Sequence, residues 1–116
     1  MAAAQIGRCQ DYAWFSANSQ GKTQRVAQKR PNAFGLFDVH GNVWEWLQDC
    51  WHGDYSGAPT EGSAWTTGCS NNSRVLRGGS WSNFPALLRS ADRDRSTPDI
   101  RDNYVGLRLA RTLLSP

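Results

Sequence analysis

Lysine is scarce in this 116-residue sequence, in which Lys22 and Lys29 stand alone against eleven arginines. Without lysine-rich stretches or evident aromatic platforms, the chain lacks the signature of a strand-binding groove, and we do not expect it to bind nucleic acid. No apolar run approaches the roughly 20 residues of a membrane-spanning helix. Residues Met1–Gly7 have neither the basic start nor the apolar stretch of a secretory signal. These absences predict a cytoplasmic protein that does not enter a membrane.

Cysteine and histidine are also few. The three cysteines, Cys9, Cys50 and Cys69, cannot all pair within one chain, and their spacings match neither a zinc ribbon nor a Cys-x-x-Cys redox motif. The two histidines, His40 and His52, are fewer than the three facial ligands of a non-haem iron centre. The sequence Cys50-Trp51-His52 resembles a metal-binding pair but has no helix-spaced partner, so we expect no transition-metal site.

The chain is long enough for one small core, because a domain of this size buries roughly two-thirds of its unfolded surface. Residues 8–116 are therefore expected to form a single domain, preceded by a tail at residues 1–7. Six tryptophans, eleven glycines and five prolines favour a turn-rich structure. Residues 74–116 carry eight arginines and four aspartates, an excess that we interpret as an internal network of arginines with carboxylates and aromatic rings.

Short elements are predicted along the chain. Residues 43–47 read as a buried strand, with Val43, Glu45 and Leu47 on one face. Residues 74–77 read as a second strand, followed by a Gly78-Gly79 bend close to Trp44 or Trp46 and a continuation at Ser80-Trp81. Further predictions are a long loop at 52–73, a short element at 87–92, a turn at 96–99 and a final strand at 104–110.

Three blocks of sequence point to a known family. The first spans residues 31–46 and reads Pro-Asn-Ala-Phe-Gly-Leu-Phe-Asp-Val-His-Gly-Asn-Val-Trp-Glu-Trp. The second, at 74–81, reads Arg-Val-Leu-Arg-Gly-Gly-Ser-Trp, and the third, at 103–111, reads Asn-Tyr-Val-Gly-Leu-Arg-Leu-Ala-Arg. Their order and spacing resemble the formylglycine-generating enzyme (sulfatase-modifying factor) family. The resemblance implies an α+β, irregular and loop-rich C-type-lectin-like fold with short antiparallel strands, truncated here to about the C-terminal half of the family domain.

Asp38 and Glu45 place two carboxylates within eight residues, with main-chain carbonyls between them. Such a set of oxygen atoms suits a hard cation, for which calcium is the candidate. The resemblance to the family implies a calcium site formed by the side chains of Asp38 and Glu45 and the carbonyls of Gly41 and Val43. In the alternative interpretation Asp38 caps a turn and Glu45 pairs with an arginine, either Arg77 or Arg108.

The enzymes of this family use copper(I), held by two cysteine thiolates that follow the Gly-Gly-Ser-aromatic block. The corresponding stretch here, residues 82–89, has no cysteine, and copper(I) selects soft thiolate ligands. We therefore expect neither copper nor formylglycine generation. A family enzyme with altered, oxidoreductase-like chemistry is the alternative, using His40, Asp92, Asp94 or Asp102 in a pocket.

Residues 80–104 alternate a regular frame with side chains of every chemical kind. This pattern resembles the variable region of ligand-binding proteins that retroelements diversify on a lectin-like scaffold, although ordinary surface loops would give a similar pattern. Aromatic anchors with adaptable polar neighbours are typical of recognition surfaces. The candidate ligand-binding residues are Asn83, Phe84, Asp92, Asp94, Asp102 and Tyr104.

The sequence thus favours a non-catalytic ligand-binding or interaction module, stabilised by calcium. Its ligand would be a protein, a peptide or a small molecule. Because the chain matches only part of the family domain, we expect a second copy or a partner chain to complete the fold.

Overall fold

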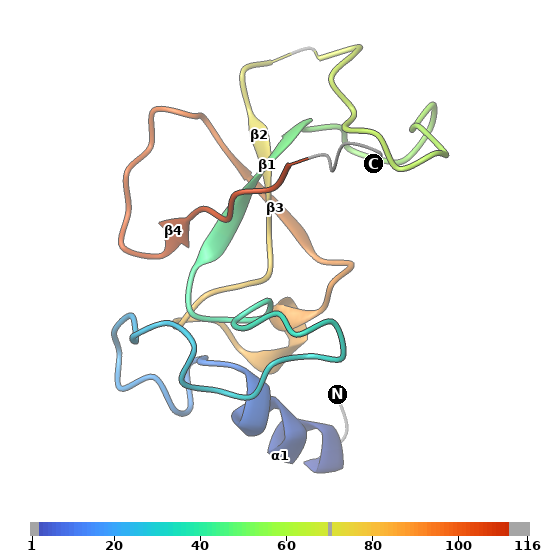
Figure 1. Cartoon of the computed structure of the whole chain (residues 1–116). Coiled ribbons are helices and arrows are strands. Elements are labelled where there is room, and N and C mark those ends of the chain that lie inside the picture. Colours follow the sequence, from blue (N-terminus) through green and yellow to red (C-terminus); the bar gives the residue numbers. More distant parts are fainter. Residues whose placement is uncertain (1–2, 70, 112–116) are drawn as a thin grey trace.

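The computed structural model describes residues 3–69 and 71–111 of the chain. In these residues a four-stranded sheet is formed by β1 (Trp44–Cys50), β2 (Arg74–Arg77), β3 (Arg93–Ser96) and β4 (Val105–Gly106). The strands lie in the order β3-β2-β1-β4. β2 is antiparallel to both of its neighbours, whereas β4 pairs with β1 in parallel. The result is a small mixed sheet, shown in Figure 1.

Two helical segments accompany the sheet: α1 (Ala3–Tyr12) and the short 3-10 helix η1 (Pro85–Leu88). In Figure 1 both lie below the sheet, with η1 between α1 and the strands. Helix α1 begins inside the segment that the sequence set apart as a tail. No helix within the described ranges is long and apolar enough to cross a bilayer.

The predicted strands at 43–47 and 74–77 are confirmed as β1 and β2. Trp44 and Cys50 are buried at the two ends of β1. In β2 the adjacent residues Val75 and Leu76 are both buried, although they face opposite sides of the sheet. Burial on both faces requires cover on both sides, and this explains why these strands carry apolar residues without strict alternation.

The bend at Gly78-Gly79 is confirmed, but its neighbours are not the predicted ones. Both glycines have positive φ, +101° and +72°. A Cβ on Gly78 would lie 2.9 Å from the carbonyl oxygen of Val39, and one on Gly79 would lie 2.5 Å from Leu88 Cδ2. The glycines therefore allow close packing against residues 39 and 88, and not against Trp44 or Trp46. The strand also fails to continue at residue 80, because the Ser80 N–H donates to Asn83 Oδ1 and starts a turn.

Two other strand predictions need correction. The final strand is limited to Val105–Gly106, which pair with Trp44 and Glu45, and the residues beyond it leave the sheet. β3 was not predicted, because Arg93–Ser96 contains no apolar residue and shows none of the alternation that marks a strand. It forms because all four of its residues pair with β2. The short element expected at 87–92 is η1, which ends at Leu88.

The core below the sheet is small. Ala13, Phe15 and Leu88 form a buried cluster against which Cys9 packs. These residues come from the end of α1, the segment after it and η1. The core thus joins the first 15 residues to the middle of the chain and fixes the walls of the pocket described next.

Candidate functional site

The turn that leads into β1 is built around Asp38. This residue is buried and has a positive φ of 56°. Its Oδ2 accepts a hydrogen bond of 2.8 Å from the Ala27 N–H. Its Oδ1 is buried without a hydrogen-bond partner among the described residues. A buried carboxylate oxygen in this state costs free energy, so the turn holds an acceptor that a cation or a water molecule would satisfy.

The next part of the turn packs directly against residue 14. Gly41 has a φ of +80°, and a Cβ there would lie 2.2 Å from the Trp14 carbonyl oxygen. The same oxygen accepts the Asn42 N–H at 2.8 Å. Asn42 also bonds through its side chain to both the N–H and the carbonyl of Gln24. The backbone near Gly41 is therefore held in place from two sides.

Glu45 forms an ion pair with Arg108. Arg108 Nε donates to Glu45 Oε1 at 2.7 Å and Nη2 donates to Oε2 at 3.4 Å. This hydrogen bond to the carboxylate raises the pKa of Arg108. Of the two arginine partners considered from the sequence, Arg108 is the one observed, whereas Arg77 donates to the Ser90 carbonyl and to Tyr55.

Two of the six candidate ligand-binding residues make contacts within the fold. Asn83 holds the turn after β2, since its Oδ1 accepts from the N–H and the hydroxyl of Ser80. Asp92 is paired with Arg89. Phe84 is 72% exposed.

Tyr104 is brought together with two of the aspartates. Its hydrogen bond to Asp102, with the charge of that carboxylate, raises the pKa of Tyr104, and the charge of Asp94 adds to the effect. Asp102 and Asp94 are therefore the two candidate carboxylates that act on Tyr104.

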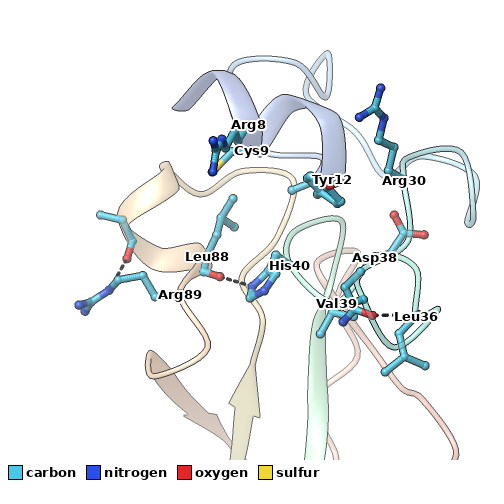
Figure 2. Close-up of a pocket in the computed structure, with 14 residues that line it drawn as sticks. Arg8, Cys9, Tyr12, Arg30, Leu36, Asp38, Val39, His40, Leu88 and Arg89 are labelled. Atoms are coloured by element: carbon cyan, nitrogen blue, oxygen red, sulfur yellow. Dashed lines mark hydrogen bonds between the residues drawn. The ribbon is translucent and has the colours of Figure 1, made fainter. Parts of the chain in front are cut away.

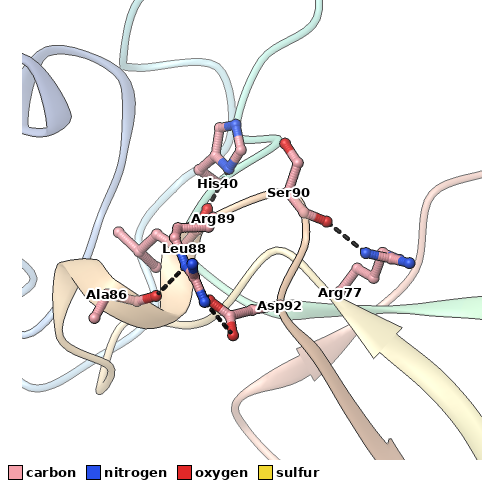
Figure 3. A network of polar contacts seen from close by, with 7 residues as sticks. All are labelled: His40, Arg77, Ala86, Leu88, Arg89, Ser90 and Asp92. Atoms are coloured by element: carbon pink, nitrogen blue, oxygen red, sulfur yellow. Dashed lines mark hydrogen bonds and ion pairs between the residues drawn. The ribbon is translucent and has the colours of Figure 1, made fainter. Parts of the chain in front are cut away.

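Figure 3 shows the contacts around Arg89. Arg89 Nε donates to Asp92 Oδ2 at 2.9 Å and to the Ala86 carbonyl at 3.2 Å. The His40 Nδ1 lies against the Leu88 carbonyl, next to this group. The His40 side chain thus connects its turn to the end of η1, whereas Arg89 holds residues 86–92 together.

A cavity lies between α1, residues 30–40 and η1, and is shown in Figure 2. Its volume is about 800 Å³. The apolar part of the wall includes Tyr12, Ala13, Leu36, Val39 and Leu88, and three arginines also line it, Arg8, Arg30 and Arg89. Cys9 also lines the cavity, and burial raises the pKa of its thiol. Asp38 and His40 contribute polar groups to the wall. Of the residues proposed for altered chemistry, His40 alone lines it.

The sequence did not predict this cavity. Its walls come from three segments that are separated by up to about 75 residues in the chain, and no local pattern links them.

Cys50 and His52, considered from the sequence as a metal-binding pair, each make a contact that stabilises the fold. Cys50 forms a disulfide with Cys69, and the His52 ring stacks on Trp65 at 3.5 Å. Within the described ranges no three His, Cys, Asp or Glu side chains are grouped to hold a metal ion.

Comparison with known proteins identifies the family. Residues 2–113 match the model of the sulfatase-modifying factor enzyme 1-like domain. The chain belongs to the sulfatase-modifying factor (formylglycine-generating enzyme) family. Among its relatives are the serine/threonine-protein kinase pkn1 of Chlamydia pneumoniae, 37% identical over 93 residues, and the formylglycine-generating enzyme of Mus musculus, 36% identical over 83 residues. These matches cover 78% and 69% of this chain, but 15% and 22% of the relatives.

Solved structures of the same family agree. PvdO from Pseudomonas aeruginosa is similar with a TM-score of 0.75 and 40% identity, over 84% of this chain and 38% of that one. Treponema denticola variable protein 1 is similar with a TM-score of 0.70 and 34% identity, over 91% of this chain and 37% of that one. The chain thus has a formylglycine-generating-enzyme-like fold, and it spans less than two-fifths of the length of these structures.

Proposed function

We propose that this chain is a non-catalytic ligand-binding or interaction module on the family scaffold, and that calcium stabilises its turn at residues 38–45. The observation that carries the proposal is the exposure of large apolar side chains. Phe34 is 87% exposed, Leu107 is 70% exposed and Leu109 is 90% exposed. Large exposed apolar patches on a folded protein mark interaction surfaces.

Arg108 joins the two segments that carry these apolar side chains, residues 34–37 and residues 107–109. Its Nη2 donates to the Phe37 carbonyl at 2.7 Å while its Nε bonds to Glu45. This link positions residues 107–109 relative to residues 34–37 and would hold both for a partner. β3 and β4 are the outer strands of the sheet, and exposed strand edges also favour pairing with another chain. The partner would be a second copy or another chain that covers these segments.

The recognition role of residues 82–104 is supported by two observations. Phe84 is exposed as an aromatic anchor would be, and Asp94, Asp102 and Tyr104 supply polar groups in a later part of the segment. The similarity to Treponema denticola variable protein 1 supports the use of this scaffold for recognition. Formylglycine generation is disfavoured because residues 82–89 lack the thiolates, and Cys50 and Cys69 are joined to each other.

The residues of the turn fit calcium. The buried Asp38 Oδ1 lacks a partner among the described residues, which is the state expected of a ligand oxygen. The carbonyls of Gly41 and Val43 would supply main-chain oxygens. Glu45 already accepts from Arg108, but a carboxylate has about four acceptor positions and can bind both. Calcium would here fix the turn and neutralise Asp38.

The disulfide bears on where the protein functions. Such bonds persist in oxidising compartments and are rare in the cytoplasm. The Cys50–Cys69 bond therefore favours an oxidising compartment over the cytoplasmic location suggested by the N-terminal sequence, and thiol trapping in cells would decide between the two.

One experiment tests the calcium and partner parts of the proposal together. Melting temperature and mass are measured with calcium and with a strong chelator, over a range of protein concentrations. Calcium at a hundred times its dissociation constant should stabilise the protein by about 2.7 kcal/mol. Asp38→Ala should lose this stabilisation by calcium. Asp54→Ala, which removes a charge from the exposed 52–73 loop, should keep it. Equal increments in both variants would refute the site.

The mass measurement tests the interaction surface independently of calcium. We expect the mass to rise with concentration, or a partner to be required for stability at low concentration. Leu109→Ser should weaken the association, whereas Leu87→Ser, at a 41% exposed position of η1, should not. A strictly monomeric protein whose stability is unaffected by Leu109→Ser would contradict the proposed partner.

A further inference from the structure

Three arginines share one face of the sheet. Arg77 of β2 is directly opposite Arg93 of β3 in the antiparallel pair. Arg95 follows Arg93 by two residues and therefore shares its face of the strand. Like charges directly opposite one another destabilise a sheet. Their presence in a short strand pair requires a compensating interaction.

Within the described residues, no carboxylate forms an ion pair with Arg77, Arg93 or Arg95. Within residues 3–69 and 71–111, the ion pairs are those of Arg89 with Asp92 and of Arg108 with Glu45. Glu45 is opposite Arg77 in the β1–β2 pair, but its carboxylate is bonded to Arg108. Asp94 lies between Arg93 and Arg95 in β3, and alternation turns it to the other face.

Aromatic rings and carbonyl groups hold the arginines instead. The Arg93 guanidinium lies 4.6 Å from the centre of the Trp51 ring and 4.5 Å from that of Tyr55, and Nη1 donates to the His52 carbonyl at 2.9 Å. Arg77 donates to the Tyr55 hydroxyl at 3.2 Å, and its contact with Ser90 is drawn in Figure 3. These contacts are with neutral groups, so the positive charges remain uncompensated while the side chains are held in place.

Of the three arginines, Arg95 has the guanidinium group that is most accessible to a ligand. It is exposed, and its guanidinium lies 5.1 Å from the centre of the Trp51 ring. Its guanidinium N–H groups take part in none of the side-chain hydrogen bonds within the described ranges, whereas its backbone N–H donates to Asp94 Oδ1. It also lines a cavity of about 370 Å³ together with Trp51, His52, Asp54, Ser56, Trp65 and Asn71. Asp54 is the acid in this wall, and its Oδ1 accepts the Ser56 N–H at 2.9 Å.

We propose that Arg95, next to the Arg77–Arg93 pair, and the cavity beside Trp51 and Trp65 that it lines form a binding site for a phosphate or sulfate ester carried on a flat ring. Guanidinium groups match the oxygen atoms of such anions in bidentate geometry. The tryptophan and histidine rings in the cavity wall provide a flat, partly apolar surface for the ring of the ligand. This site goes beyond the proposed function, because it uses none of the residues of the apolar surface or of the calcium turn.

The test uses calorimetric titration at constant ionic strength with three probes: inorganic phosphate, phenyl phosphate and phenyl sulfate. Saturable binding of a phenyl ester, tighter than that of inorganic phosphate, is expected. Arg95→Gln should weaken it about tenfold, the loss of one charge-assisted hydrogen bond. Arg25→Gln removes the same charge from an exposed loop residue and should leave the affinity unchanged.

Each outcome has a defined meaning. Tighter binding of phenyl phosphate than of phenyl sulfate assigns the site to phosphate esters, and the reverse assigns it to sulfate esters. Equal binding of inorganic phosphate and phenyl phosphate would overturn the ring contact. The absence of saturable binding, or equal weakening by both variants, would overturn the site. Because Arg95 is exposed, its variant should fold, and an unchanged melting curve confirms this.

Discussion

Replacing Gly41 with alanine tests how closely the turn at residues 38–45 packs against residue 14. The chain offers a matched control, because Gly41 and Gly35 have nearly the same φ, +80° and +78°. A Cβ at Gly41 would lie 2.2 Å from the Trp14 carbonyl oxygen, whereas a Cβ at Gly35 would meet no atom within 4 Å. Both variants carry the same backbone cost, so the difference between them measures the packing contact alone.

The expected magnitudes follow from these two terms. A non-glycine residue in the left-handed region costs about 1–2 kcal/mol, and this is the whole effect expected for Gly35→Ala. In Gly41→Ala the Trp14 carbonyl must also move by about 1 Å to reach an ordinary separation. The same carbonyl accepts the Asn42 N–H at 2.8 Å, so this movement weakens a hydrogen bond of the turn. Overpacking of this kind adds about 1–3 kcal/mol.

The assay is urea unfolding followed by circular dichroism, with the free energy of unfolding extrapolated to water. Gly41→Ala should lose about 2–5 kcal/mol, the sum of the two terms. That is a large fraction of the 5–15 kcal/mol typical of whole domains. Equal losses in the two variants would refute the reasoning, because they would show that the segment of residue 14 yields to the new methyl group without cost.

Two further predictions concern the Cys50–Cys69 disulfide and Tyr104. The disulfide closes a loop with a sequence separation of 19 residues, so its reduction should lower the free energy of unfolding by about 3 kcal/mol; an unchanged urea midpoint with reductant would contradict this. Asp102 raises the pKa of Tyr104, so Asp102→Asn should lower that pKa in an ultraviolet titration of a Tyr12→Phe, Tyr55→Phe background. The raised pKa means that the pair of Asp102 and Tyr104 stabilises the fold at neutral pH. This contribution to stability is lost as pH rises through the pKa of Tyr104. An unchanged titration of Tyr104 in Asp102→Asn would argue against the hydrogen bond.

Local patterns in the sequence were sufficient for the two central strands. Val-Trp-Glu-Trp-Leu and Arg-Val-Leu-Arg contain the aromatic and β-branched residues that favour strands, and β1 and β2 lie at these places. The Gly78-Gly79 bend was also predictable, since consecutive glycines mark positions of positive φ. An arginine such as Arg77 or Arg108 was predictable as the partner of Glu45 from charge, and the structure shows that it is Arg108.

Other features depended on pairings that no local pattern records. β3 contains only polar residues and exists because β2 offers it a partner at every position. Conversely, the apolar alternation at residues 104–110 predicted a long strand, but only Val105–Gly106 find a partner in β1. Strand formation at the edges of this sheet is decided by tertiary hydrogen bonding, and propensity is a weak guide there.

The family and its central strands were determined by the sequence itself, because motif residues and apolar alternation are local properties. The tertiary structure decided which of the candidate residues meet. It brought Arg108 to Glu45 and His40 to the Leu88 carbonyl, and left Asp38 Oδ1 buried without a partner in the described part of the chain. It also placed Arg77 opposite Arg93, since register is set by the whole sheet and a shift of one residue would turn these side chains to the other face.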